Sequence, residues 1–211
     1  QLDEVIAFGG RLLVKTDRAK YKNTRETSLF NKSKTLYNVN LVKKEKRAGG
    51  LSSLIMVEGY MDAISLYEAG FKNVVASMGT SLTKEQARLC KRYTDNVFIS
   101  YDGDFAGQKA NLRGLDILKQ EGLKVRVVPM PDGYDPDDVI QKTGADGYRA
   151  CLEKAMPLID FRIHATRLKY DLSKTDEKRD FIREALPIVK EAESATEREE
   201  LLKRLSADTG V

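Results

Sequence analysis

The stretch Leu54-Ile55-Met56-Val57-Glu58-Gly59-Tyr60-Met61-Asp62 decides the fold of this chain. Its first four residues are apolar and predict a short strand that is buried on both faces. An amphipathic run from Tyr60 to Ala69 follows at once and stops before Gly70, which predicts a helix. Further along the chain, three more runs have the composition of buried strands: Val74–Ala76, Asn96–Tyr101 and Val125–Val128.

Helical patterns separate these four runs. Thr83 and Gln86 form a capping-box pair that predicts the start of one helix, and a longer helix is expected from about Phe105 to Gln120. Strands that alternate with helices favour a parallel sheet with helices on both faces. We therefore predict an α/β fold.

The flanking regions differ from this central part. Residues 1–50 carry many turn formers and predict part of a small basic α+β lobe, mostly short strands and loops. After Pro157 the pattern is helical to the end, with a second capping box expected at Thr196 and Glu199. The expected division is 1–50 for the basic lobe, 51–145 for the α/β domain and 146–211 for a helical subdomain. Because the chain starts at Gln1 without a methionine, we expect it to be part of a longer protein.

The charge of +4 is unevenly distributed along the 211 residues. Residues 11–47 hold twelve Lys or Arg against three Asp or Glu, a net +9, so the rest of the chain sums to −5. A basic region beside an acidic one suits a polyanionic partner. No apolar run approaches the roughly 20 residues that cross a bilayer, which excludes a helical membrane protein. One His and two distant Cys cannot form a zinc site, and the spacing of the two Cys favours core residues over a disulfide.

Carboxylates follow three of the four predicted strands. Glu58 comes directly after the first, Asp102 and Asp104 after the third, and Asp135 and Asp137 after the fourth. Because the carboxyl ends of parallel strands meet at one edge of a sheet, we expect these groups to lie close together.

Asp62 joins this set, since it lies four residues after Glu58 at the start of the predicted helix. So many carboxylates in one cleft stay ionised only where divalent cations neutralise them. Hard oxygen ligands favour Mg²⁺ or Mn²⁺, and such sites serve phosphoryl transfer. Any one Asp in a loop is more often a turn former, and only the three segments at strand ends taken together indicate a cation site. Ala106 and Arg113 exclude a calcium-binding EF-hand loop starting at Asp102.

Three of these segments together resemble the Toprim domain of bacterial DNA primases: Val57-Glu58-Gly59-Tyr60-Met61-Asp62, Tyr101-Asp102-Gly103-Asp104 with Ala106-Gly107, and Asp135-Pro136-Asp137. A Glu in one motif and Asp-x-Asp in the next is shared with topoisomerases and some nucleases. The basic segments Phe8–Arg11 and Lys20–Thr27, with Phe30 and Lys32, resemble motifs of the primase RNA-polymerase core. The resemblance covers essentially the whole chain.

The resemblance implies a role for each matching residue. Glu58 would be a general base or a carboxylate that organises the metal, and Asp102 and Asp104 would be the principal metal ligands. The remaining implied positions are Asp62, Asp135 and Asp137 in the acidic cluster, and Arg11, Lys20 and Lys32 on template or nucleotide phosphate.

The implied activity is synthesis of short RNA primers on single-stranded DNA from ribonucleoside triphosphates, with two or more Mg²⁺ or Mn²⁺ ions. The resemblance further implies a monomer in the bacterial cytoplasm, at the replisome. In this family a zinc-binding domain precedes the core and a helicase-binding domain follows it, and we expect both to lie outside this sequence.

Two other interpretations remain open at this point. One is a different Toprim enzyme, a topoisomerase or a nuclease, although none of the nine Tyr is singled out as a nucleophile. The other is a nucleic-acid-binding module without activity that has kept the fold. A nicking assay and a titration with Mn²⁺ separate these from a primase.

Overall fold

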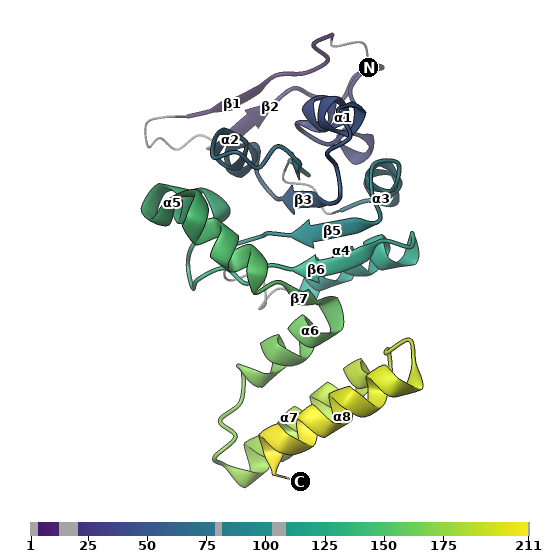
Figure 1. Ribbon diagram of the computed structural model, residues 1–211, viewed down its shortest axis with the longest axis vertical. Helices are drawn as coiled ribbons and strands as arrows, with labels where there is room; N and C mark the ends of the chain where they lie inside the picture. The colour runs from purple at the N-terminus through teal and green to yellow at the C-terminus, as the bar shows by residue number, and fades with distance from the viewer. Residues whose placement is uncertain (1–3, 13–20, 79–81, 103–108, 211) are drawn as a thin grey trace.

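The computed structural model describes residues 4–12, 21–78, 82–102 and 109–210. In Figure 1 the N-terminal elements lie at one end, a sheet lies in the middle and the last helices lie at the other end. The elements are β1 (Gly9–Arg11), β2 (Tyr21–Asn23), η1 (Lys32–Lys34), α1 (Val39–Arg47), β3 (Leu54–Val57), α2 (Tyr60–Glu68), β4 (Val74–Ala76), α3 (Lys84–Lys91), β5 (Asn96–Ile99), α4 (Lys109–Gln120), β6 (Lys124–Val127), α5 (Pro136–Glu153), β7 (Met156–Pro157), α6 (Leu158–Arg167), α7 (Thr175–Val189) and α8 (Ala195–Thr209).

The central sheet has the strand order β4-β3-β5-β6-β7. The first four strands in this order are parallel, with Ile55 of β3 paired to Val74 of β4 on one side and to Phe98 of β5 on the other. The predicted parallel α/β sheet is therefore confirmed. The two-residue strand β7 pairs antiparallel with β6 and was not predicted.

Alternate residues of β3 enter two different cores, as the period of a strand requires. Leu54 and Met56 pack with residues of α3, α4 and α6, whereas Ile55 and Val57 pack with residues of α2 and α5. Helices thus cover both faces, which explains why all four β3 residues are apolar and buried.

The N-terminal part consists of the β1–β2 hairpin, η1 and α1. Helix α1 was not predicted, because its sequence Val39–Arg47 contains only three apolar residues among charges. Val42 on its inner side is fully buried in the same core as Leu54. The Asn38 side chain donates to the Val74 carbonyl at 2.9 Å, which fixes the start of α1 beside β4.

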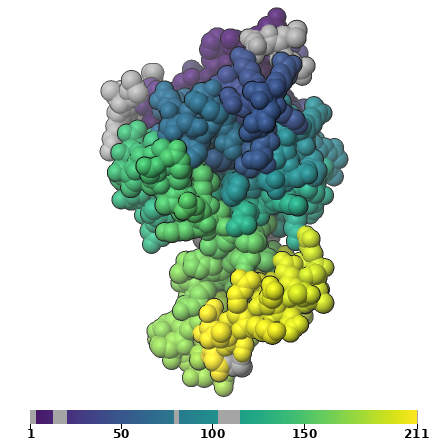
Figure 2. Space-filling view, viewed as in Figure 1, coloured from purple at the N-terminus to yellow at the C-terminus, as the bar shows by residue number. Residues whose placement is uncertain are grey.

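The C-terminal helices α6, α7 and α8 share a separate apolar cluster that includes Phe181, Ala185 and Leu201. Figure 2 shows this part as a distinct lobe below the sheet. The predicted cap at Thr196 and Glu199 was wrong by two residues: Ser194 is the N-cap of α8 and accepts from the Glu197 backbone N–H.

Helix α5 crosses the predicted boundary at residue 145, with a break at Gly144, whose φ of 70° is left-handed. The division into 1–50, 51–145 and 146–211 stays a prediction. None of the helices in the described ranges is long and apolar enough to cross a membrane.

Candidate metal and nucleic-acid site

Two of the predicted acids follow neighbouring parallel strands. Glu58 comes directly after β3 and is half-buried, and Asp102 comes three residues after the end of β5 and is exposed. Because β3 and β5 are hydrogen-bonded neighbours, both acids lie at the carboxyl edge of the sheet. Asp104 falls in 103–108, outside the described residues.

Asp62 links this edge to the first turn of α2. Its side chain is buried, with 8% of the residue exposed, and its Oδ2 accepts from the Gly59 backbone N–H at 3.2 Å. Burial, and then the nearby carboxylates of Asp135 and Asp102, raise the pKa of Asp62 to about 7. The structure therefore brings acids from three predicted segments close enough to repel one another.

The third segment forms the start of α5. Asp135 is the N-cap, and its Oδ1 accepts from the Asp138 backbone N–H at 2.7 Å. The Asp137 backbone N–H donates to the Asp62 carboxylate, which ties α5 to α2. The Asp137 side chain accepts from Gln141 at 3.3 Å. Asp135 thus has a structural role as well as its place in the acidic cluster.

Sequence reasoning missed two residues of this edge. Tyr101 is buried, and the pKa of its hydroxyl is raised by burial and then by the nearby Glu58 carboxylate, while a hydrogen bond with Ser77 opposes this. Asp138 completes the capping box of α5. The Asp-Pro-Asp-Asp sequence at 135–138 is a signal for that box, with Pro at the first helical position.

The acidic edge has the donor chemistry of a magnesium or manganese site, since its groups are carboxylate oxygens. Burial is the main cause of the raised pKa of Asp62, and the nearby carboxylates of Asp135 and Asp102 add to it, as like charges do. Among the described residues, however, no three His, Cys, Asp or Glu side chains are grouped closely enough to hold a metal ion. The principal ligand set predicted from the sequence includes Asp104, which the structure does not describe.

The two predicted basic residues that the structure describes lie in different elements. Arg11 is exposed on β1, where its guanidinium lies over the Tyr21 ring at 5.8 Å from the centroid. Lys32 is half-buried in η1, and its carbonyl accepts from the side chain of Gln86 at 2.9 Å. Lys20 falls in 13–20, outside the described residues.

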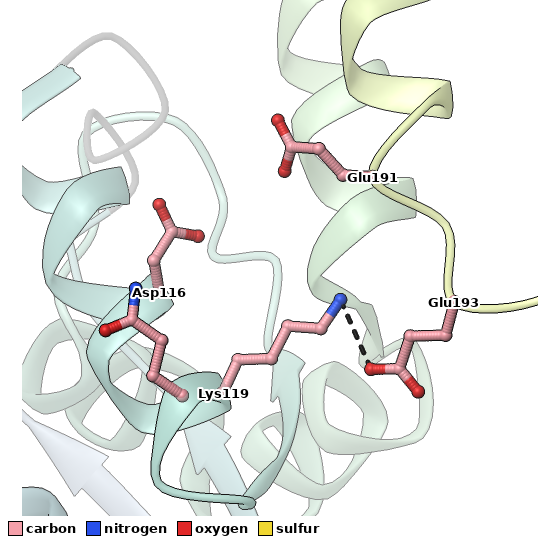
Figure 3. Close-up of a pocket in the computed structure, with 5 residues that line it drawn as sticks. Asp116, Lys119, Glu191 and Glu193 are labelled. Carbon is pink, nitrogen blue, oxygen red and sulfur yellow. Dashed lines mark ion pairs between the residues drawn. The ribbon is translucent and has the colours of Figure 1, made fainter.

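A shallow hollow lies elsewhere, between the end of α4 and the turn that joins α7 to α8 (Figure 3). Lys119 and Glu193 form an ion pair across it at 3.3 Å, and Glu191 pairs with Arg162. None of the predicted site residues lines it, and the end of α4 is at the amino edge of the sheet. We assign it no part in the site.

Comparison with known proteins gives three family matches along the chain. The family described as Toprim-like matches residues 55–140, the N-terminal domain of the DNA primase catalytic core matches 1–43, and the DnaB-helicase binding domain of primase matches 159–211. The last match corrects our expectation that a helicase-binding segment lies outside this sequence: α6, α7 and α8 resemble such a domain.

Individual relatives agree with these matches. The chain is 40% identical over 208 residues to the DNA primase of Clostridium acetobutylicum, covering 99% of this chain but 34% of that protein. It therefore spans about a third of the curated relative's length.

Two solved structures are also similar. The RNA polymerase domain of Mycobacterium tuberculosis primase DnaG, in complex with a DNA oligomer, superposes with a TM-score of 0.80 at 31% identity, covering 98% of this chain and 67% of the other. A DnaG primase catalytic domain bound to single-stranded DNA gives 0.73 at 36% identity, covering 98% and 65%. The chain belongs to the DnaG-type DNA primases and comprises part of their catalytic core, with its Toprim domain.

Proposed function

We propose that this chain supplies the active site of an enzyme that synthesises short RNA primers on single-stranded DNA from ribonucleoside triphosphates. The observation that carries the proposal is that the Asp135 and Asp102 carboxylates act on Asp62 at the sheet edge where Glu58 follows β3. Family membership and the relative bound to single-stranded DNA support the same substrates.

In this proposal the acidic residues hold Mg²⁺ or Mn²⁺. Asp102 and Asp104 would be the main ligands, with Glu58, Asp62, Asp135 and Asp137 completing the set. Bound cations would orient the triphosphate and stabilise charge on the attacking and leaving oxygens.

Other residues are assigned the roles of base, phosphate contact and positioning. Glu58 is the candidate base for the primer 3′ hydroxyl, because it is half-buried at a strand end. Arg11, Lys20 and Lys32 bind template or nucleotide phosphate without reading its sequence. Asp135 and Asp138 fix the start of α5, and the Asp137 backbone N–H then holds the Asp62 carboxylate in place.

The proposal extends to partners. We infer that residues 159–211 contribute to contact with a DnaB-type replicative helicase, on the basis of the matching family. The same helices also fall within the catalytic-core structures, which cover 98% of this chain, so they would serve the core as well. The site of action would be the bacterial replication fork.

The deciding experiment replaces Asp102 with Asn in the full-length protein that contains this chain. Primer synthesis on single-stranded DNA with Mg²⁺ should fall at least about 100-fold, because a metal ligand is lost. Binding of the DNA should change little, since the basic residues remain. Asp146→Asn is the matched control, because Asp146 is exposed on α5 and pairs only with Arg149 among the described residues.

Retained synthesis in Asp102→Asn would reject the assigned site. Plasmid nicking without primer synthesis by the wild-type protein would indicate a topoisomerase or nuclease instead. Absence of Mn²⁺ binding in a calorimetric titration would favour an inactive binding module.

A further inference from the structure

Three tyrosine rings lie where the β1–β2 hairpin meets the Toprim domain. Tyr60 is the first residue of α2, two positions after Glu58. Its ring stands edge-on to Tyr21 of β2, with centroids 5.4 Å apart and planes at 84°, and lies 5.9 Å from the ring of Tyr37. Figure 1 shows the hairpin passing over α2 at this point.

The same ring also touches the other strand of the hairpin. A Cβ atom placed on Gly9 of β1 would lie 3.2 Å from Cε1 and 3.3 Å from Cζ of Tyr60. Such distances are too short for a side chain to fit without movement of a neighbour, so the bare backbone of β1 lies directly against the ring. Tyr60 therefore contacts both strands of the hairpin.

Arg11 is connected to this contact through Tyr21. The two residues are paired across the hairpin, and the guanidinium lies over the Tyr21 ring. The hairpin itself is closed by the bonds between Phe8 and Thr24, of which Phe8 N–H to Thr24 Oγ1 is 2.8 Å. A shift of the hairpin on Tyr60 would therefore move Arg11 with it.

The Tyr60 ring, rather than its hydroxyl, makes these contacts. The hydroxyl is buried and has no hydrogen-bond partner among the described residues. Phenylalanine would retain the edge-on aromatic geometry, whereas leucine would retain apolar volume and lose that geometry. This difference gives a conservative variant with which to test the role of the ring.

We propose that Tyr60 is a positioning residue that holds the β1–β2 hairpin, and with it the Arg11 cation, at a fixed place beside the acidic edge. This inference rests on the proposed function, because Arg11 is taken to bind phosphate there. Tyr60 touches no reacting atom. It acts by keeping a phosphate-binding cation in register with the carboxylates two residues away in the sequence.

The test compares Tyr60→Leu and Tyr60→Phe in the full-length protein, by kinetics of primer synthesis. In Tyr60→Leu the KM for ribonucleoside triphosphate should rise about tenfold while kcat stays within about threefold, because binding geometry is loosened but the acids are untouched. Tyr60→Phe should remain within about twofold of wild type in both constants. Tyr67→Leu is the control, because Tyr67 is on the same helix but packs under Lys72.

A double-mutant cycle with Arg11→Ala tests whether Tyr60 acts through Arg11. We expect Arg11→Ala to weaken binding in the wild-type background and to add much less in Tyr60→Leu, since coupled residues are not additive. If Tyr60→Leu does not fold, Tyr21→Leu removes the same ring contact from the hairpin side, where Tyr21 is 39% exposed, and should raise KM in the same way.

Three results would each overturn the inference. One is an unchanged KM in Tyr60→Leu and Tyr21→Leu, and another is a Tyr60→Phe protein as impaired as Tyr60→Leu. The third is a double mutant whose loss of binding is the full product of the two single losses. The same double-mutant cycle can be measured by binding alone, by titrating each protein with a labelled single-stranded oligonucleotide. A wild-type protein that makes no primer would reject the proposed function, whereas the role of Tyr60 would still be judged from this binding.

Discussion

The acidic edge and the basic hairpin are built in opposite ways. Glu58 and Asp102 follow strands that are paired on both sides, and the buried Asp62 accepts hydrogen bonds from two backbone N–H groups. The hairpin has three residues in each strand, and Arg11 and Tyr21 are exposed. Regular elements thus fix the carboxylates, whereas ring contacts hold the hairpin.

The difference has a chemical reason. Carboxylates that share a cation site must stay within a narrow distance of one another despite their repulsion, which requires a rigid scaffold. The phosphate-binding cation Arg11 is positioned by fewer contacts, the ring contacts of the hairpin, and losing them should weaken binding without unfolding the sheet. If this account is right, changes at the acidic edge should alter stability strongly and changes in the basic region should mainly alter binding.

The largest stability effect is expected from Asp62→Asn. The pKa of Asp62 is raised to about 7, so the folded protein holds a proton that the unfolded chain releases near pH 4. The free energy of unfolding should therefore fall as pH rises from about 4 to 7, by no more than about 4 kcal/mol from this group. Asparagine stays neutral and can still accept from Gly59, so Asp62→Asn should stabilise the protein at pH 8 and not at pH 4.

Urea unfolding at both pH values, with EDTA to remove metal ions, measures this effect. Asp146→Asn serves as the control, because Asp146 is exposed. Mg²⁺ at pH 8 should stabilise the wild type more than Asp62→Asn. Equal stability of wild type and variant at pH 8 would show that the Asp62 carboxylate is not strained by its neighbours.

A smaller effect on the free energy of unfolding is expected from Gln86→Ala, which breaks the link between η1 and α3. Gln86 is fully buried, and its Nε2 donates to the carbonyls of Lys32 at 2.9 Å and Thr35 at 3.1 Å. Its removal takes the Gln86 donor from both carbonyls and leaves the Lys32 carbonyl with only the Thr35 backbone N–H, at 3.4 Å. The loss should cost about 2–3 kcal/mol in the free energy of unfolding. Gln120→Ala, at an exposed position of α4, should change it by less than about 0.5 kcal/mol.

Equal effects of the two alanine substitutions would mean that η1 is attached by other contacts. The expected result instead places Lys32 with the rigid part of the molecule, although it belongs to the basic region by sequence. The boundary between the rigid part and the part held by ring contacts would then lie between the hairpin and η1.

The sequence predicted the rigid part well, for physical reasons. The apolar run Leu54–Val57 and the capping pair Thr83 and Gln86 are local signals, and both elements form where expected. The placement of Glu58 and Asp102 at one edge follows from parallel pairing alone. Local sequence pattern, together with the rule that parallel strands end at the same sheet edge, was sufficient to predict these elements and the position of the two acids.

The remaining features depend on contacts between distant residues. Helix α1 has a weak local pattern and is held by Val42 and by the bond of Asn38 to β4. The contact of Tyr60 with Gly9 joins residues 51 positions apart, and no local signal marks it. Likewise, the pairing of β7 with β6 requires the chain to return after α5. These contacts could not be read from periodicity or composition.

The smallest change in stability, with a clear change in binding, is expected from Lys32→Ala. Lys32 is half-buried in η1, so losing its side chain should alter the free energy of unfolding by less than about 0.5 kcal/mol. If its ammonium contacts one phosphate, the slope of log K against log salt for single-stranded DNA should become shallower by about 0.7. Lys124→Ala is the control, because Lys124 is exposed at the amino end of β6, away from the acids.

An unchanged slope would remove Lys32 from the phosphate contacts. Measuring the salt dependence of Lys32→Ala and of Arg11→Ala in the Tyr60→Leu background distinguishes how η1 and the hairpin are held. Lys32→Ala should lose the same slope there as in wild type, because η1 is held by Gln86. Arg11→Ala should lose less, because its hairpin depends on the Tyr60 ring. Equal losses for the two cations would mean that hairpin and η1 move as one body, and the contrast between a rigid and a loosely attached part would then fail.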